Sequence, residues 1–444
     1  MKRFQSLSEE AFLRLFFLLF SCCFLVAAPL MPDRQRMLTG LWEIITAPCK
    51  SQTNYFGIGG FSATFLNMGL IGLICAGLYC LPGKKPANTY TLATILTVGF
   101  GAWGINPVNV LPTFLGVVVF CLVKKARLGE YAHAMLFSTG IAPLITDLMV
   151  RYPHPEVVGH NPLGAFIALL VGFVIGFLLP AGLVYSPKVH KGFDLYSAAL
   201  PVGMTAFFLN GVLYKTLGIP LPGGPAPEIQ AVASASIVNL FCGVMFLLCI
   251  LFALLLGCRP GDYRKLLTNP EQVKSVSGQY GNGVFLMNVG VFGLFILAYY
   301  NLVGATFNGV IFGIVFCMLS TCNSGSHPAN VLPIMLGYLL AAAISWGLST
   351  FLGGTFEYVP NAQAIVVGLC YANGLSPISD KYGWKYGVLA AAMHYLLVTS
   401  VPSLHGGYCL YNGGFTAALV CVLLIPQLEQ RVLPEARRRY LGKQ

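Results

Sequence analysis

The chain has 444 residues, of which 56% are hydrophobic and only 9% are charged, and its formal net charge at pH 7 is +11. Soluble domains carry about 25% charged residues, so this composition, with a mean hydropathy of +0.74, excludes an ordinary soluble protein. It predicts an integral membrane protein that contacts the lipid bilayer along most of its length.

Apolar runs of roughly 17 to 25 residues, the length that crosses about 30 Å of hydrocarbon, recur along the whole chain. Lipid offers no hydrogen-bond partners, and the alternating pattern of barrel strands is missing, so these runs predict helices. We expect an all-α protein with about fourteen membrane elements, over residues 11–30, 57–82, 89–104, 107–123, 131–150, 163–185, 194–214, 231–258, 280–300, 304–321, 329–352, 361–376, 386–402 and 408–426.

The first run follows Lys2 and Arg3 and could be a secretory signal, but Glu9, Glu10 and Arg14 favour a retained anchor. Cytoplasmic loops retain Lys and Arg. With the N-terminus inside, 20 of the 26 Lys and Arg residues lie inside and one lies within the first run; the five outside are Arg34, Arg36, Lys50, Arg151 and Lys215. We therefore expect a membrane protein with both termini on the cytoplasmic side.

The positive net charge follows from this loop asymmetry and from a basic tail at residues 428–444, so nucleic-acid binding is not expected. The fourteen cysteines include no C-x-x-C pair, and most lie inside apolar runs, where they are expected to act as small buried side chains. We expect no metal and no cofactor. The composition is compatible with a homo-oligomer.

A polar, proline-broken phrase occurs twice, as GINPVNVLPTFLG at residues 104–116 and as GSHPANVLPIMLG at residues 325–337. NMGLIG at 67–72 and NVGVFG at 288–293 are separated by the same length of chain as the two phrases, so no net gap accumulates between these blocks. Two further pairs follow in the same order: SPKVHKGFDLY at 186–196 with VPSLHGGYCLY at 401–411, and GIAP at 140–143 with GLSP at 374–377. These matches predict two copies of one unit.

We place the first copy at residues 55–215 and the second at 276–427, with an anchor and connector at 1–54 and a linking membrane helix within 216–275. Each copy has six predicted elements, and one run lies between them. The second copy would therefore enter the membrane from the opposite side. This parity predicts inverted repeats related by a pseudo-two-fold axis in the membrane plane.

The repeated phrases have the chemistry of helix starts. Asn106 before Pro107 predicts an N-cap, and His327 before Pro328 is its weaker counterpart. The free N–H groups of such a start can bind a carbonyl, a hydroxyl or an anion. The elements around the first phrase reach only about 24 to 26 Å at 1.5 Å per residue, which favours broken or re-entrant helices. The alternative is an ordinary turn kept for packing.

Asn109 and Asn330, three residues after these caps, are the first candidates for solute contact. Pro112 and Pro333 are expected to kink the helices that follow. Asn67 and Asn288, each beside glycines, are further candidates. For Asn109 and Asn330 the alternative is a hydrogen bond that only joins helices, and for Asn67 and Asn288 it is close helix packing beside an amide.

His190 and His405, followed by Tyr196 and Tyr411, stand at the start of the last element of each copy. They are candidate gating or proton-sensitive groups, and the alternative is a set of interfacial anchors. His394 is the best candidate among ionisable residues deep in a run, against a packing histidine with hydrogen bonds. Asp147 lies near the end of its run. The scarcity of buried carboxylates disfavours proton coupling through a carboxylate.

The chain lacks H-E-x-x-H, G-x-S-x-G and P-loop motifs and paired intramembrane aspartates, which disfavours enzyme activity without excluding it. Its duplicated N/H-P-x-N-V-L-P and H-x-G-[FY]-x-L-Y blocks resemble an uncharacterised, duplicated family of bacterial multi-pass membrane proteins, known as a domain of unknown function. That resemblance covers nearly the whole chain and implies no activity.

Two further groups are similar in architecture only. Aquaporins join two Asn-Pro helix starts by inverted repeat, but here the second start is His327-Pro328. Urea channels have duplicated helices and glycine-rich polar blocks. The resulting hypothesis is a transporter or channel for a small polar or anionic solute, with its site between the copies near the midplane. The alternative is a membrane enzyme or envelope-assembly protein that acts on a lipid.

Overall fold

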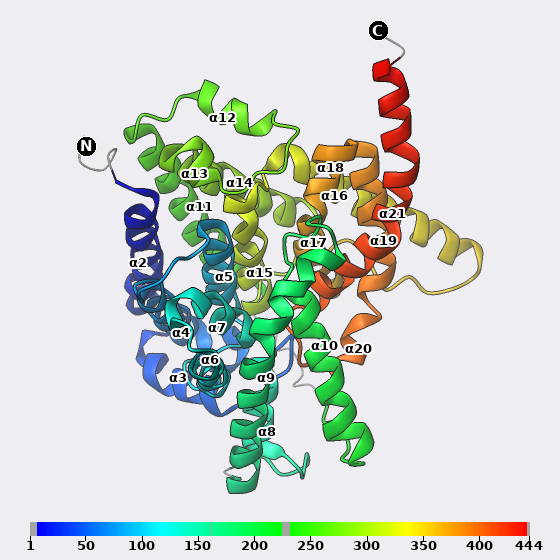
Figure 1. The fold of residues 1–444 in the computed structure, drawn as a ribbon. Helices are drawn as coiled ribbons and strands as arrows, with labels where there is room; N and C mark the ends of the chain where they lie inside the picture. The colour runs from blue at the N-terminus through cyan, green and yellow to red at the C-terminus, as the bar shows by residue number, and fades with distance from the viewer. Residues whose placement is uncertain (1–6, 160, 224–230, 442–444) are drawn as a thin grey trace.

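A computed structural model describes residues 7–159, 161–223 and 231–441 (Figure 1). These residues form helices, turns and connecting segments, and no strand occurs among them. The first half contains α2 (Glu9–Ala27), α3 (Met37–Thr46), α4 (Tyr55–Tyr79), α5 (Ala87–Phe100), α6 (Leu111–Lys124), α7 (Ala132–Ser138), α8 (Ala142–Arg151), α9 (Pro162–Val189), α10 (Ala199–Asn210) with a π-helical end η5 (Gly211–Thr216), and α11 (Ala231–Leu255).

The second half contains α12 (Pro260–Leu267), α13 (Val276–Tyr280), α14 (Asn282–Leu302), α15 (Gly309–Leu319), α16 (Pro328–Phe351), α17 (Gln363–Ala372), α18 (Ser376–Tyr382), α19 (Trp384–Val398), α20 (Val401–Leu404) and α21 (Asn412–Leu441). Short 3₁₀ turns complete it, among them η6 (Ser320–Ser324) and η7 (Asn373–Leu375).

Eight helical segments among the described residues are long and apolar enough to cross a membrane: Glu9–Leu30, Tyr55–Tyr79, Leu128–Arg151, Pro162–Val189, Ser234–Leu255, Asn282–Leu302, Pro328–Phe351 and Asn412–Gln430. The structure is therefore that of an all-helical, multi-pass membrane protein. Each of the fourteen predicted runs contains helix, but several of the helices are too short to span hydrocarbon alone. Fourteen crossings remain a prediction.

The N-terminal helix α2 packs into the core against both halves. Phe16 lies 5.1 Å from Phe285 between ring centroids, and Phe24 lies 6.1 Å from Phe65. Such edge-to-face and tilted aromatic contacts stabilise buried packing. The helix α2 therefore covers part of the core formed by both halves.

Both halves break the helix at the same point. Gly60 interrupts α4 with φ +83°, and its counterpart in the second copy, Gly281, separates α13 from α14 with φ +90°. Glycine reaches these angles because it has no Cβ. After the first break, the carboxylate of Asp33 accepts hydrogen bonds from the backbone N–H groups of Phe61 (2.7 Å) and Ser62 (2.9 Å).

The repeated asparagines also make the same hydrogen bonds. Asn67 Nδ2 donates to the carbonyls of Gly101 (2.6 Å) and Ile105 (2.7 Å). Asn288 Nδ2 donates to the carbonyls at the matching positions of the second copy, Cys322 and Ser326 (both 2.9 Å). The sequence repeat is therefore a repeat of local structure as well.

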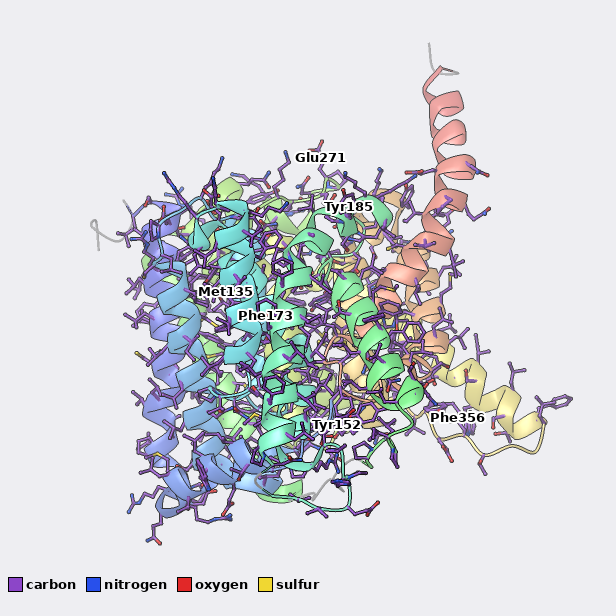
Figure 2. The ribbon with its side chains drawn as sticks, turned by 60° about the horizontal axis from the view of Figure 1, so that its bottom comes forward. Met135, Tyr152, Phe173, Tyr185, Glu271 and Phe356 are labelled. Carbon is purple, nitrogen blue, oxygen red and sulfur yellow. The ribbon has the colours of Figure 1, made fainter. Side chains whose placement is uncertain are left out.

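Corresponding elements lie at opposite ends of the molecule. In Figure 1, α3 and α8 lie in the lower part, whereas α12 and α18, which occupy the matching places in the second half, lie in the upper part. Figure 2 likewise shows Tyr152, just after α8, near one end and Glu271, just before α13, near the other.

Candidate functional site

Two connecting segments tie the copies together. The first link, residues 190–196, joins α9 to α10, and the second link, residues 405–411, joins α20 to α21. In the first link, Leu195 N donates to the carbonyl of Gly374 in the second copy (3.0 Å). In the second link, Leu410 N donates to the carbonyl of Gly140 in the first copy (2.8 Å). These residues are the matching positions of the repeat, so each link makes the same bond to the opposite copy.

Each link ends in a tyrosine, and the ring of that tyrosine lies against the glycine that accepts the hydrogen bond of the same link. A Cβ on Gly374 would lie 2.7 Å from the ring of Tyr196, and a Cβ on Gly140 would lie 2.1 Å from the ring of Tyr411. No side chain fits at such distances. Glycine in the GLSP and GIAP blocks therefore lets each tyrosine enter the opposite copy.

Tyr196 and Tyr411 meet a third ring, Tyr371 of α17, in the interior. The ring centroids of Tyr196 and Tyr371 are 5.1 Å apart, and those of Tyr371 and Tyr411 are 6.2 Å apart. Tyr196 Oη donates to the carbonyl of Cys317 (2.8 Å), and Tyr371 Oη donates to the carbonyl of Leu410 (2.5 Å). All three side chains are fully buried.

Asn373, in η7, completes this central cluster, which we define as Tyr196, Tyr371, Asn373 and Tyr411. Asn373 Nδ2 donates to the carbonyl of Met318 (3.0 Å) and to Thr321 Oγ1 (2.6 Å). By contrast, Asn373 Oδ1 and the hydroxyl of Tyr411 are buried without a hydrogen-bond partner among the described residues. A buried polar atom without a partner costs about 1 to 3 kcal/mol. These two atoms therefore have unused hydrogen-bonding capacity.

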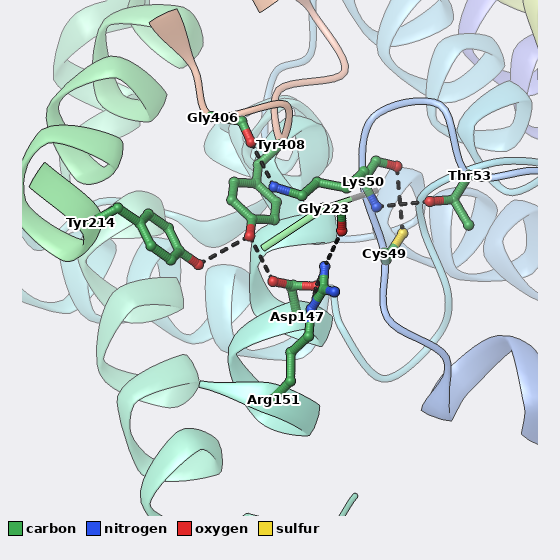
Figure 3. Close-up of polar contacts among 9 residues, drawn as sticks. All are labelled: Cys49, Lys50, Thr53, Asp147, Arg151, Tyr214, Gly223, Gly406 and Tyr408. Carbon is green, nitrogen blue, oxygen red and sulfur yellow. Dashed lines mark hydrogen bonds and ion pairs between the residues drawn. The ribbon is translucent and has the colours of Figure 1, made fainter. Parts of the chain in front are cut away.

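A charged cluster lies at one end of the interface between the copies (Figure 3). Arg151 Nε donates to Asp147 Oδ1 (2.6 Å), both on α8, and their side chains are only 9% and 1% exposed. The second link supplies Tyr408, whose hydroxyl donates to Asp147 Oδ2 (2.6 Å) and lies 3.0 Å from the hydroxyl of Tyr214. A buried ion pair needs such additional bonds to offset its desolvation.

Lys50 brings a second positive charge to this cluster. Its Nζ donates to the carbonyl of Gly406 (2.7 Å) and lies 3.6 Å from the centroid of the Tyr408 ring. That geometry is a cation–π contact. Burial lowers the pKa of Lys50 to about 8, and Asp147 and Arg151 act on it with opposite signs. With two cations and one carboxylate, the charged cluster favours an anion.

The first link repeats this backbone at the other end. Lys191 and Gly192 have φ of +52° and +82°, and their counterparts Gly406 and Gly407 have φ of +61° and +75°. Ser51 N donates to the carbonyl of Gly407, and Gln272 Nε2 donates to that of Gly192, both at 2.7 Å. The matching links therefore share one conformation and one kind of anchoring bond.

The side chains at this end are different. Phe193 replaces Tyr408, and Lys381 Nζ lies 5.0 Å from the centroid of its ring. Asp194 replaces Cys409 and is only 2% exposed. Its Oδ1 accepts from Tyr196 N (2.9 Å), and its own N donates to His190 Nδ1 (3.3 Å), whereas Oδ2 has no partner among the described residues. Asp194 lies outside the eight membrane-spanning segments, and burial raises its pKa to about 7.

The first phrase is held by its own asparagines. Asn106 Oδ1 accepts from Val108 N (3.0 Å) and Asn109 N (2.9 Å), as an N-cap does, but the α-helix starts only at Leu111. Asn109 Oδ1 accepts from Asn106 N, and Asn109 Nδ2 donates to Thr146 Oγ1, both at 2.9 Å. The expected kink at Pro112 is wrong, because this proline lies in the first turn of α6, where its missing N–H breaks no helical bond.

The second phrase follows the prediction more closely. His327 caps α16, with Nδ1 accepting from Asn330 N (3.4 Å), while Asn330 Oδ1 accepts from His327 N (3.0 Å). Asn330 Nδ2 also donates to Asp380 Oδ2 (2.8 Å). Pro333 lies inside the helix, as expected.

The structure joins Asn67 to the first phrase and Asn288 to the second, through bonds to carbonyls inside or just before each phrase. The hydrogen-bond partners of Asn109 and Asn330 lie within their own copies. In this conformation their amides stabilise the turn and the helix start of the two repeated phrases. Direct contact with a solute remains a prediction.

The link histidines and tyrosines are buried inside the protein, which disfavours the interfacial-anchor alternative. His190 Nε2 lies 2.8 Å from Ser197 Oγ, and His405 Nδ1 lies 2.6 Å from Asn412 Oδ1, the matching position. His394 has partners at both ring nitrogens, Tyr338 Oη (2.6 Å) and the carbonyl of Gly413 (2.7 Å). That is the geometry of a packing histidine.

A cavity of about 500 Å³ lies beside the break at Gly281. Its lining includes the carboxyl side chains of Glu9 and Asp262, which makes it unsuited to an anion in this conformation. Within the described ranges, no three His, Cys, Asp or Glu side chains gather as metal ligands.

Sequence reasoning missed Lys50, Arg151 and Tyr408 of the charged cluster, Asp194 of the first link, and the interior pair Tyr371 and Asn373. Two signals were present in the sequence. Asp147 and Arg151 are four residues apart in an otherwise apolar helix, and GFDLY and GYCLY differ at the acid itself.

A family model described as a protein of unknown function (DUF1576) matches residues 33–215 and 261–430. The chain therefore belongs to this family, and the two matched stretches confirm the duplication. Each match begins before the predicted copy, so it includes α3 or α12. No curated protein and no solved structure matches the chain.

Proposed function

We propose that this member of the DUF1576 family transports a small polar or anionic solute across the membrane, and that the solute binds between the two copies near the middle of the bilayer. The observation that carries the proposal is the reciprocal exchange of the two links. Each copy holds a segment of the other by the same hydrogen bond, at Gly374 and at Gly140. Two equivalent joints of this kind allow one copy to rock against the other around a central site.

The proposal includes inverted repeats with a pseudo-two-fold axis in the membrane plane. Support comes from the placement of matching elements at opposite ends, with α3 and α8 below and α12 and α18 above (Figure 1). The matching breaks at Gly60 and Gly281 give further support, since discontinuous helices are a common feature of transporters built this way.

We assign solute contact to the central cluster. Within the part of the chain that the structure describes, Tyr411 Oη and Asn373 Oδ1 are buried polar atoms without hydrogen-bond partners, one a donor and one an acceptor, and they come from a region shared by both copies. Asn106, Asn109, His327 and Asn330, with Asn67 and Asn288, hold the broken segments beside it. Rearrangement of these breaks would free their amides for the solute.

The preference for an anion rests on the charged cluster. Lys50 and Arg151 outnumber Asp147 in a buried setting, where charge acts more strongly than in water. Both cations belong to the set predicted to face outside, so the charged cluster would form the outer entrance of the pathway. The proposed location is a bacterial cytoplasmic membrane with both termini inside.

Transport is tested with purified protein in proteoliposomes and radiolabelled phosphate, succinate, aspartate, urea and glycerol as separate probes. The proposal expects saturable uptake of at least one probe, above that of empty liposomes, with a preference for an anion. Uptake of none of the five would overturn it, and movement or cleavage of a labelled phospholipid instead would favour a protein that acts on lipid.

Orientation is tested by single cysteines at residues 218 and 262, both in the described part of the chain, on a background without Cys80, the exposed native cysteine. We expect a membrane-impermeant maleimide added to intact cells to label residue 218 only. Labelling of both positions from one side would contradict the inverted repeats.

A further inference from the structure

We propose that Asp194 is a proton-carrying residue, and that the protein moves one proton together with its solute. This inference rests on the transport function proposed above and names the coupling ion of the same site. It contradicts the expectation from sequence that buried carboxylates are too scarce for proton coupling, because Asp147 and Asp194 are both buried in the structure.

The two buried carboxylates differ in their partners. Asp147 accepts from Arg151 and from Tyr408, so its negative charge is compensated. Asp194 accepts one backbone hydrogen bond, from Tyr196 N, and its second oxygen has no partner among the described residues. A buried carboxylate without a counter-charge takes up a proton far more readily than one in an ion pair.

Among the described residues, the groups that face Asp194 include no neutralising cation. Its own link supplies His190 and Tyr196, and α21 supplies Cys421, which lies close enough to interact with its charge. On α18, Lys381 and Tyr382 face the neighbouring Phe193 instead. Lys191 is paired with Glu429 at the surface. The ionised form of Asp194 is therefore stabilised by hydrogen bonds alone.

The place of Asp194 in the fold connects protonation to the movement of the copies. A Cβ on Gly374 would lie 2.9 Å from Asp194 Oδ1, and the next residue, Leu195, makes the cross-copy bond to Gly374. Tyr196 follows directly and enters the central cluster. Ionisation of Asp194 would favour a hydrated position, and movement toward water would pull on this joint.

The second link has Cys409 at the matching position, where Asp194 stands in the first. Cys409 is also fully buried, so the two sites differ in acidity and not in burial. A proton-binding group at one joint only makes the two ends of the transport cycle unequal, as a coupled transporter requires.

The proton balance is simple. The carboxylate of Asp194 accepts one proton from water on the side from which the solute enters, and becomes a neutral carboxylic acid. After the copies rock, the acid releases that proton to water on the other side and becomes a carboxylate again. With a monovalent anion as the solute, one full cycle moves one proton and one negative charge in the same direction, so the cycle transfers no net charge.

The test uses full-length protein in liposomes that contain the pH dye pyranine, with external sodium salts of phosphate, succinate and aspartate as probes. Wild-type protein is expected to acidify the interior as the transported probe enters. Asp194→Asn is expected to reduce this acidification at least tenfold, while exchange of the labelled probe across equal concentrations stays within about twofold, because exchange needs no proton release. Asp194→Glu should restore acidification.

Glu429→Gln is the matched control, since Glu429 is an acid on the neighbouring helix with a surface lysine as its partner. It should acidify the interior like wild type. Acidification that persists in Asp194→Asn, or uptake by wild type without acidification, would overturn this inference and leave transport intact. Absence of uptake for every probe would overturn the proposed function itself.

Discussion

The two links have the same backbone and opposite chemistry. Each link turns through two consecutive residues with positive φ, and the carbonyl of the second residue accepts a hydrogen bond from outside the link. Each link also donates a hydrogen bond to a glycine of the other copy. Yet the second link places Tyr408 in a charged cluster, and the first places Asp194 in an uncompensated site. Figure 2 shows that these ends are far apart, with Tyr185 beside the first link near the top and Tyr152 near the bottom.

This difference shows which features the two copies must share and which side chains can differ between them. Glycines at the joints are fixed by the close approach of rings, since a Cβ would overlap them. Side chains that contact only their own end can change. In a transporter, such changes allow an anion entrance at one end and a proton site at the other.

The largest expected effect is at Asp147. Asp147→Asn leaves Lys50 and Arg151 buried without a counter-charge, and removal of one partner of a buried ion pair costs about 3 to 5 kcal/mol. We expect this loss in the free energy of unfolding, measured in mixed micelles. Lys381 occupies the position of the second copy that matches Asp147, and it is exposed. Lys381→Met should therefore cost no more than about 0.5 kcal/mol. Equal effects would mean that the ends are not chemically distinct.

The next effect concerns pH at Asp194. Its pKa of about 7 in the folded protein lies above the ordinary value of 3.8, so the folded state holds the proton more tightly than the unfolded state. Stability should therefore fall as pH rises from about 4 to about 7, by about 1.4 kcal/mol for each unit of pKa shift. The Asp194→Asn variant should lose this dependence of the free energy of unfolding on pH. The Cys409→Ser variant should keep the same slope as wild type. A wild-type slope that survives in Asp194→Asn would contradict the assignment.

A smaller effect is expected at the joints. Gly374→Ala and Gly140→Ala introduce a Cβ within 2.7 Å and 2.1 Å of a tyrosine ring of the opposite copy, and overpacking of this kind costs about 1 to 3 kcal/mol. Gly347 lies in α16, and a Cβ added there would meet no neighbouring atom within 4 Å. Gly347→Ala should therefore stabilise the protein by up to about 1 kcal/mol. Thermal unfolding of the three variants decides this. Neutral joint variants would mean that the links do not hold the copies together.

Much of the fold followed from the sequence, because blocks repeated in the same order identify matching positions without any structure. The second helix start at His327 was predicted from local chemistry and confirmed. The predicted kink at Pro112 was wrong because the turn at residues 107–110 delays the start of α6. A proline kinks a helix in its interior but not in its first turn.

The charged cluster could not be predicted in the same way. Lys50, Asp147 and Tyr408 come from distant parts of the chain, and only the fold brings them together. The exchange of links was equally hidden, because a hydrogen bond from Leu195 to Gly374 leaves no pattern in local hydropathy. The burial of His190, His405 and their tyrosines was hidden in the sequence for the same reason.

The smallest expected effect separates the two link tyrosines. Tyr196→Phe removes a hydroxyl that donates to the carbonyls of Cys317 and Cys370, and should cost about 1 kcal/mol. Tyr411→Phe removes a hydroxyl without a partner, so it should be neutral or stabilising. Equal losses of stability in the two variants would show that Tyr411 has a structural bond after all.

The site between the copies is tested most directly by uptake in Tyr411→Phe. This variant keeps the ring and the fold, and removes only the polar atom assigned to the solute. Loss of one buried hydrogen bond of about 1 to 3 kcal/mol should lower solute affinity roughly five- to a hundredfold. We predict that Tyr411→Phe, as stable as wild type, takes up the transported probe at least fivefold more slowly at low concentration. Wild-type uptake by this variant would contradict a solute site in the central cluster.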